Sequence, residues 1–211
     1  MDYNKLEKDL NNILKMFPNF EVEWGVVQND AWDKDTHPYN IYTLSDFIKK
    51  WKGCNDLKKV KYALTRWFRY WCAKCDENCF CGEKAVPNPN QKDKNWDIKF
   101  KNLKNSDDIE FDVKSTRLPN SWSNKDTIDG DKLIEWYYKN QSKGSRNSYQ
   151  NRIFVVHIPN HGKTETNLRC DFEKKRGLIN EYYKSIECGG HTPHKLTVDG
   201  HEITADIIFV L

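Results

Sequence analysis

Two short segments carry acidic and basic residues in the alternating pattern of strands whose two faces differ. In residues 95–100 (NWDIKF) and 109–116 (IEFDVKST), polar and apolar side chains alternate, and a period of two is typical of a half-buried strand. Asp112 and Lys114 share one face of the second strand, and Asp97 lies in the first. If the polar faces of the two strands coincide, two carboxylates and an ammonium group converge. Such a group is suited to metal-assisted hydrolysis of a phosphodiester.

That reaction needs a nucleophilic water, neutralisation of the phosphate charge and help for the leaving oxygen. A divalent cation such as Mg²⁺ or Mn²⁺ supplies all three and prefers oxygen ligands. We therefore predict that Asp97, Asp112 and the carbonyl group of Val113 bind this ion. Lys114 would orient or deprotonate the water, or stabilise charge on the phosphate. The alternation by itself also fits a solvent-facing strand with weak charge pairs, and the pattern does not separate the two interpretations.

The order of these residues resembles the signature of the restriction-endonuclease-like superfamily, the PD-(D/E)XK nucleases. Trp96-Asp97 stands where that family often has Pro-Asp, and Asp112-Val113-Lys114 matches its acidic-X-Lys triplet. The resemblance covers roughly residues 55–160. It implies an α/β (α+β) fold with a central mixed β-sheet flanked by helices. It also implies a Mg²⁺-dependent endonuclease acting on DNA, or alternatively RNA, with Asp97, Asp112 and Lys114 as catalytic residues. Because one site cuts one strand, duplex cleavage would favour a homodimer.

Further polar residues are candidates for a supporting role. Members of the superfamily often carry Gln, Arg or Lys on the helix after the triplet. A helix is expected over residues 132–141, so Gln141 and Arg146 lie near its end. Glu110 shares a face with Asp112 and is a candidate extra ligand. The end of a solvated helix explains Gln141 and Arg146 equally well, and a charge at the edge of the sheet explains Glu110 equally well. An apolar strand over 152–158 completes the expected strand–strand–strand–helix–strand order.

Four of the seven cysteines lie within ten residues: Cys72, Cys75, Cys79 and Cys81. In a reducing compartment, so dense a group favours a metal over disulfides. We expect a long helix to end at Cys75 and a tight turn to bring back Cys79 and Cys81. Four thiolates suit structural Zn²⁺, and an iron–sulfur cluster is the rival. Reduced structural thiols without a metal are the remaining alternative.

A second group near the C-terminus comprises Cys188, His191 and His194. These spacings could place all three on one Zn²⁺ ion. Gly189, Gly190 and Pro193 also mark an ordinary loop, in which histidines are often merely exposed.

Length and composition favour one domain over residues 1–211, with the cysteine cluster at 72–82 as an insertion. The chain has 31% charged residues, 13% aromatic residues and a net charge of +3, too small to indicate nucleic-acid binding by itself. No apolar run is long enough for a membrane span, and the first residues do not resemble a signal peptide, so we expect a cytoplasmic protein. Besides the nuclease, a second function fits the sequence: a non-catalytic DNA-binding or protein-interaction module on the same fold, stabilised by zinc.

Two local signals fix element boundaries. Thr43, with Asp46 three residues later, predicts the start of a helix over 44–52. Asp199-Gly200 predicts the tight turn of a hairpin.

Overall fold

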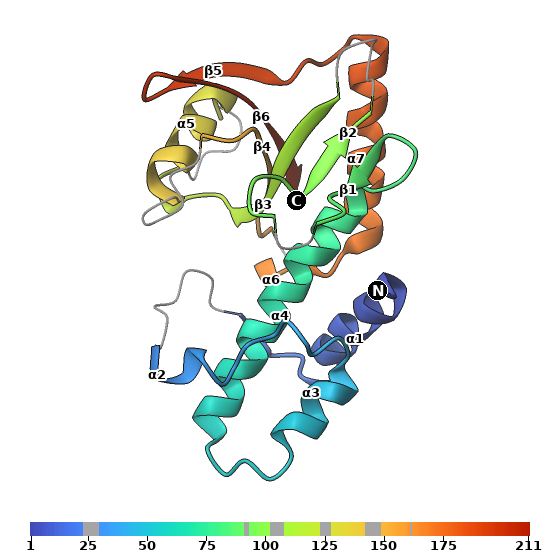
Figure 1. The fold of residues 1–211 in the computed structure, drawn as a ribbon, viewed down its shortest axis with the longest axis vertical. Coiled ribbons are helices and arrows are strands. Elements are labelled where there is room, and N and C mark those ends of the chain that lie inside the picture. The colour runs from blue at the N-terminus through green and yellow to red at the C-terminus, as the bar shows by residue number, and fades with distance from the viewer. Residues whose placement is uncertain (23–29, 91–92, 102–107, 123–127, 142–148, 161) are drawn as a thin grey trace. The chain divides into compact units, whose positions relative to one another are not determined.

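The computed structural model describes residues 1–211 except 23–29, 91–92, 102–107, 123–127, 142–148 and 161 (Figure 1). Its residue contacts divide the chain into two compact units. The first comprises Met1–Cys75 and His161–Phe172, and the second comprises Asp76–Asn160 and Glu173–Leu211. Compact units need not fold independently, so the single domain expected for residues 1–211 stays a prediction.

The first unit is helical in its described residues. Its helices are α1 (Tyr3–Met16), α2 (Asp30–Asp33), α3 (Leu44–Trp51), the first part of α4 (Leu57–Phe80) and α6 (Glu165–Arg169). Thr43 caps α3, because its hydroxyl oxygen accepts a hydrogen bond of 3.1 Å from the backbone N–H of Asp46. This confirms the start predicted from sequence.

Two tryptophans of α4 anchor the core of the first unit. Trp67 and Trp71 are buried, and a buried indole N–H needs an acceptor. Both donate to the carbonyl oxygen of Ile41, at 2.7 and 2.8 Å. The loop before α3 is therefore held against α4.

The second unit is built on a six-stranded mixed sheet. Its strands are β1 (Ala85–Pro87), β2 (Ile98–Phe100), β3 (Ile109–Arg117), β4 (Arg152–His157), β5 (His194–Val198) and β6 (His201–Val210), in the order β1-β2-β3-β4-β6-β5. β1, β2 and β3 are antiparallel neighbours, β4 is parallel to both β3 and β6, and β5 is antiparallel to β6. The sheet lies between α5 (Gly130–Gln141) and α7 (Phe172–Cys188), and a short 3₁₀ turn, η2 (Asn120–Trp122), follows β3 (Figure 1). The predicted mixed sheet flanked by helices is thus confirmed.

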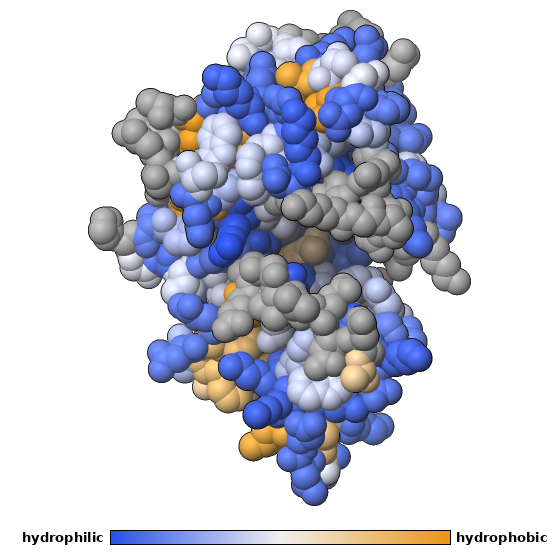
Figure 2. All heavy atoms as spheres, turned by 90° about the vertical axis from the view of Figure 1, so that its left-hand side faces the viewer, coloured by the Kyte–Doolittle hydropathy of each residue, from blue (hydrophilic) through white to orange (hydrophobic). Residues whose placement is uncertain are grey.

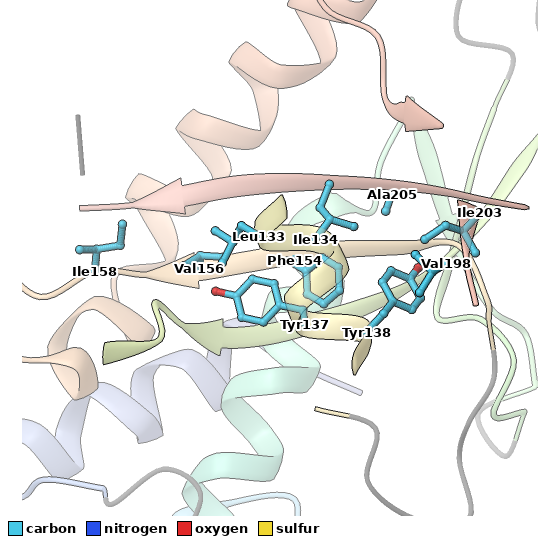
Figure 3. Close-up of a cluster of buried hydrophobic side chains, with 10 residues drawn as sticks. All are labelled: Leu133, Ile134, Tyr137, Tyr138, Phe154, Val156, Ile158, Val198, Ile203 and Ala205. Atoms are coloured by element: carbon cyan, nitrogen blue, oxygen red, sulfur yellow. The ribbon is translucent and has the colours of Figure 1, made fainter. Parts of the chain in front are cut away.

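Helix α5 covers one face of this sheet with an apolar stripe. Leu133, Ile134, Tyr137 and Tyr138 are spaced to lie on one side of a helix and pack on β4 and β6 (Figure 3). Tyr137 stacks on Phe154 of β4 with ring centroids 4.7 Å apart. Burial of each such side chain stabilises the fold by about 1.5–3 kcal/mol.

The β5–β6 turn confirms the hairpin prediction. Asp199 and Gly200 both have positive φ values, 48° and 82°, as the tight turn requires. Figure 2 shows a mainly hydrophilic face, in keeping with the 31% of charged residues. In the part of the chain that the structure describes, no helix is long and apolar enough to cross a membrane.

Candidate active site

Asp112 lies at the centre of a small group of charged side chains on the sheet. It is in β3, where it pairs in register with Arg152 of the parallel strand β4. Lys114 Nζ donates to Asp112 Oδ1 at 2.6 Å, and Arg152 Nε donates to Asp112 Oδ2 at 3.1 Å. Asp112 and Arg152 are only 6% and 4% exposed. Each oxygen of this buried carboxylate is therefore bonded to its own cationic side chain.

Asp97 lies beside this carboxylate, one residue before β2. Ile98 pairs with Phe111 at this end of the antiparallel β2–β3 ladder, and the backbone N–H of Asp97 donates to the carbonyl oxygen of Phe111 at 2.9 Å. Asp97 Oδ2 accepts a hydrogen bond of 3.0 Å from the backbone N–H of Val113. The structure thus brings together the three residues predicted to be catalytic.

The pKa of Asp112 reflects this crowding. Burial raises it above its usual range, Lys114 opposes that rise, and the neighbouring Asp97 carboxyl group adds to it. Burial and a like charge both disfavour the ionised form, whereas a nearby cation favours it. The carboxyl group of Asp97 is therefore close enough to affect the ionisation of Asp112.

The backbone of Val113 faces the same side as Asp97. In a strand, the N–H and C=O of one residue point to the same neighbour. Because the Val113 N–H donates to Asp97, its carbonyl oxygen faces that side of β3 too. Two carboxylates and this carbonyl group are oxygen donors of the kind that Mg²⁺ and Mn²⁺ prefer, so these residues fit the predicted cation.

Arg152 is the residue of this site that sequence reasoning missed. Its guanidinium group lies over the ring of Tyr138 of α5, 4.7 Å from the centroid. The signal was an arginine at the first position of a strand whose next four residues are apolar. With Asp97 and Asp112 ionised, Lys114 and Arg152 balance their two negative charges.

The supporting residues predicted from sequence have different outcomes. Glu110 forms an ion pair of 2.9 Å with Lys99 of β2, whereas Lys114 pairs with Asp112. Gln141 is the last residue of α5, and its side chain lies outside the described part of the structure. Arg146 lies outside the described residues altogether. Their supporting roles stay predictions.

The cysteine cluster differs from the expected local structure. α4 continues to Phe80 instead of ending at Cys75, so Cys79 is helical. Seven residues of helix rise about 10.5 Å, whereas two sulfurs on one Zn²⁺ ion are at most about 4.6 Å apart. Cys72 and Cys79 therefore cannot share an ion while α4 is helical at this point.

Two of these thiols, Cys72 and Cys81, are wholly or largely buried. Burial, together with the charge of Glu77, raises the pKa of Cys81 to about 11. Cys72 Sγ lies 4.0 Å from Cys170 Sγ, and both side chains are buried.

The two histidines of the C-terminal group lie near a carboxylate, that of Asp206. His191 Nε2 lies 2.7 Å from Asp206 Oδ2, and His194 Nε2 lies 3.9 Å from Asp206 Oδ1. Cys188 is exposed and donates to the carbonyl oxygen of Ser185. Among the described residues, no three or more His, Cys, Asp or Glu side chains are grouped so that they could hold a metal ion.

Comparison of the chain with protein-family models, curated proteins and solved structures finds no match.

Proposed function

We propose that this protein is a metal-dependent endonuclease of restriction or defence type that hydrolyses DNA phosphodiester bonds. The observation that supports this most is the convergence of Asp97, Asp112 and Lys114 on one stretch of β3: Asp97 accepts from the backbone N–H of Val113, and Lys114 donates to Asp112. The element order β1-β2-β3-α5-β4 supports a restriction-endonuclease-like arrangement as part of the same proposal. A homodimer would supply the second site that duplex cleavage needs.

The residues of the site would divide the work as follows. Asp97, Asp112 and the Val113 carbonyl group would hold Mg²⁺ or Mn²⁺, which supplies an activated water and charge neutralisation. Lys114 is bonded to Asp112 Oδ1, so its ammonium group would leave this oxygen when a cation is bound there. It could then donate to a phosphate oxygen or to the attacking water. Arg152 would keep its bond to Oδ2 and so hold the Asp112 carboxylate in a fixed orientation.

The test is cleavage of supercoiled and linear DNA with Mg²⁺, with Mn²⁺ and with EDTA. The proposal predicts nicking that needs the metal and is lost in Asp97→Asn and Asp112→Asn, which keep the shape of each side chain. Glu202→Gln is the matched control, because Glu202 is an exposed carboxylate of the same sheet, in β6, and has no part in the proposed site. Cleavage that persists in Asp112→Asn would contradict the proposal.

A second function is favoured by one specific observation. Both oxygens of Asp112 are occupied by cations, as in an ion-pair network that only stabilises a fold. A non-catalytic DNA-binding or protein-interaction module would use the site in this way. Retained DNA binding without cleavage in any metal would support the module.

A structural metal at the four cysteines is a separate part of the proposal. Zn²⁺ or an iron–sulfur cluster at Cys72, Cys75, Cys79 and Cys81 would require α4 to unwind beyond Cys75, because helical rise separates the thiols. Metal analysis of the purified protein, with its visible absorption spectrum, tests this point. A protein free of zinc and iron would leave these residues as reduced thiols.

A further inference from the structure

The first unit carries a cluster of aromatic rings, which we name the aromatic surface: His37, Tyr39, Tyr42, Tyr70 and Trp71. Tyr39 stacks on His37 with centroids 5.6 Å apart and meets Tyr70 of α4 edge to face at 5.1 Å. Tyr70 packs on Trp71 at 4.8 Å, and Trp71 contacts Tyr42 at 5.7 Å. Neighbouring rings therefore fix the orientation of Tyr39, although this side chain is 54% exposed.

Helix α4, which carries Tyr70 and Trp71, has only basic charged residues along most of its length. Residues 57–75 of α4 contain no Asp or Glu, and their charged residues are Lys58, Lys59, Lys61, Arg66, Arg69 and Lys74. Side chains four residues apart lie on the same face of a helix. Arg66 and Lys74 therefore lie one turn before and one turn after Tyr70.

The loop that leads to Tyr39 also lies among cations. Arg66 Nη1 donates to Thr36 Oγ1 at 2.8 Å and to Asp33 Oδ1 at 2.7 Å. Lys59 pairs with Asp35 at 2.7 Å and lowers the pKa of that carboxyl group, and the charges of Lys50 and His37 add to the effect. The loop before Tyr39 is thus bonded to cations of α4 and α3, and Asp33 and Asp35 neutralise part of their charge.

We propose that the aromatic surface binds an unpaired DNA strand, with a base stacked on Tyr39 and phosphates near the basic residues of α4. Ordered aromatic rings beside basic side chains are the combination that binds single-stranded nucleic acids. In a duplex, stacking on the neighbouring base pairs covers the base faces that such a ring would contact. A neutral carbohydrate or an apolar protein segment would use the rings but would gain nothing from the positive charge. The choice of DNA rests on the proposed nuclease function.

The test measures binding without cleavage. A fluorescent oligothymidylate of about 12 nucleotides is titrated in EDTA and followed by anisotropy, beside a duplex and an RNA of the same length. We expect Tyr39→Ala to weaken binding of the single strand at least about fivefold, the loss of one stacked base. Tyr39→Trp should restore it, and binding should weaken as salt rises.

Phe17→Ala is the matched control, because Phe17 is an exposed aromatic residue of the same unit (51%) outside the aromatic surface. The proposal is overturned if Tyr39→Ala binds as the wild type does, if Phe17→Ala weakens binding equally, or if the duplex or the RNA binds more tightly than single-stranded DNA. Cleavage is measured separately with Asp112→Asn. The binding of a single strand by the aromatic surface is therefore tested by Tyr39→Ala, and the nuclease function by Asp112→Asn. Either proposal can be contradicted while the other stands.

Discussion

Replacement of Arg152 by methionine tests whether the buried charges of the site depend on one another. Methionine keeps most of the length of the side chain but removes the guanidinium group that bonds to Asp112 Oδ2. The variant therefore leaves a carboxylate that is 6% exposed with Lys114 as its one remaining cationic partner among the contacts described above.

The expected loss of stability in Arg152→Met follows from the burial of the Arg152–Asp112 ion pair. Removing one partner of a buried ion pair costs about 3–5 kcal/mol. Lys114 still neutralises Oδ1 and lowers this cost, whereas the lost interaction of Arg152 with the Tyr138 ring adds about 0.5–2 kcal/mol. We expect the free energy of unfolding to fall by about 3 kcal/mol at neutral pH.

Urea unfolding with linear extrapolation measures this change. The Arg117→Met variant is the control, because Arg117 is exposed at the end of the same strand β3, and it should change stability by less than about 0.5 kcal/mol. The benefit of the Arg152 pair is present only while Asp112 is ionised. The difference between wild type and Arg152→Met should therefore shrink as the pH falls through the raised pKa of Asp112.

A loss below about 0.5 kcal/mol would refute this reasoning. A deficit that stays constant into the acid range would refute the part that assigns the cost to the ionised carboxylate.

Three further predictions concern pH, a second buried pair and a helix glycine. Because the pKa of Asp112 is raised, protons should compete with the metal at a higher pH than they would at an ordinary carboxyl group. The acid limb of the pH–rate profile should therefore move to lower pH at higher Mn²⁺, and an unmoved limb would contradict this. Lys175 donates to Asp76, and both side chains are 1% exposed. Lys175→Met should therefore lower the free energy of unfolding in urea by about 3–5 kcal/mol. Replacement of the exposed Lys184 of the same helix by methionine should lower it by less than about 0.5 kcal/mol. Gly177 is inside α7 and a Cβ there meets nothing within 4 Å, so Gly177→Ala should raise the free energy of unfolding by about 0.5–1 kcal/mol; a loss would contradict the open space at this position.

The features predicted correctly depend on signals that are local in the chain. The alternation over residues 109–116 identifies β3 because the side-chain period of a strand is two. Thr43 identifies the start of α3 because its hydroxyl group reaches the N–H of Asp46. Asp199-Gly200 identifies the hairpin because both residues tolerate positive φ.

The end of α4 was not predicted, because a distant residue helps to determine it. Asp76 and Lys175 are 99 residues apart in sequence and form a buried ion pair. A carboxylate buried at the turn after Cys75 needs such a partner, and α7 provides it. This pairing stabilises the turn that continues the helix through Cys79, and no local pattern reveals it.

Arg152 was missed for a similar reason. Its contact with Asp112 depends on the parallel pairing of β3 with β4 and on their register. Sequence patterns identify both strands but do not fix which residues lie opposite each other across a parallel pair joined by a helix. The contact of Lys114 with Asp112, by contrast, follows from its place two residues later on the same face of β3.

The most direct test of the proposed function compares two lysines in similar structural settings. Lys114 of β3 pairs with Asp112 at 2.6 Å, and Lys99 of the adjacent strand β2 pairs with Glu110 at 2.9 Å. Single-turnover cleavage of plasmid DNA in Mg²⁺ is measured for Lys114→Ala and Lys99→Ala. The account predicts that Lys114→Ala slows cleavage by about 10²-fold or more, whereas Lys99→Ala stays within a few-fold of the wild type. Equal rates in the two variants, or a Lys114→Ala variant as active as the wild type, would contradict the assignment of this site as a nuclease centre.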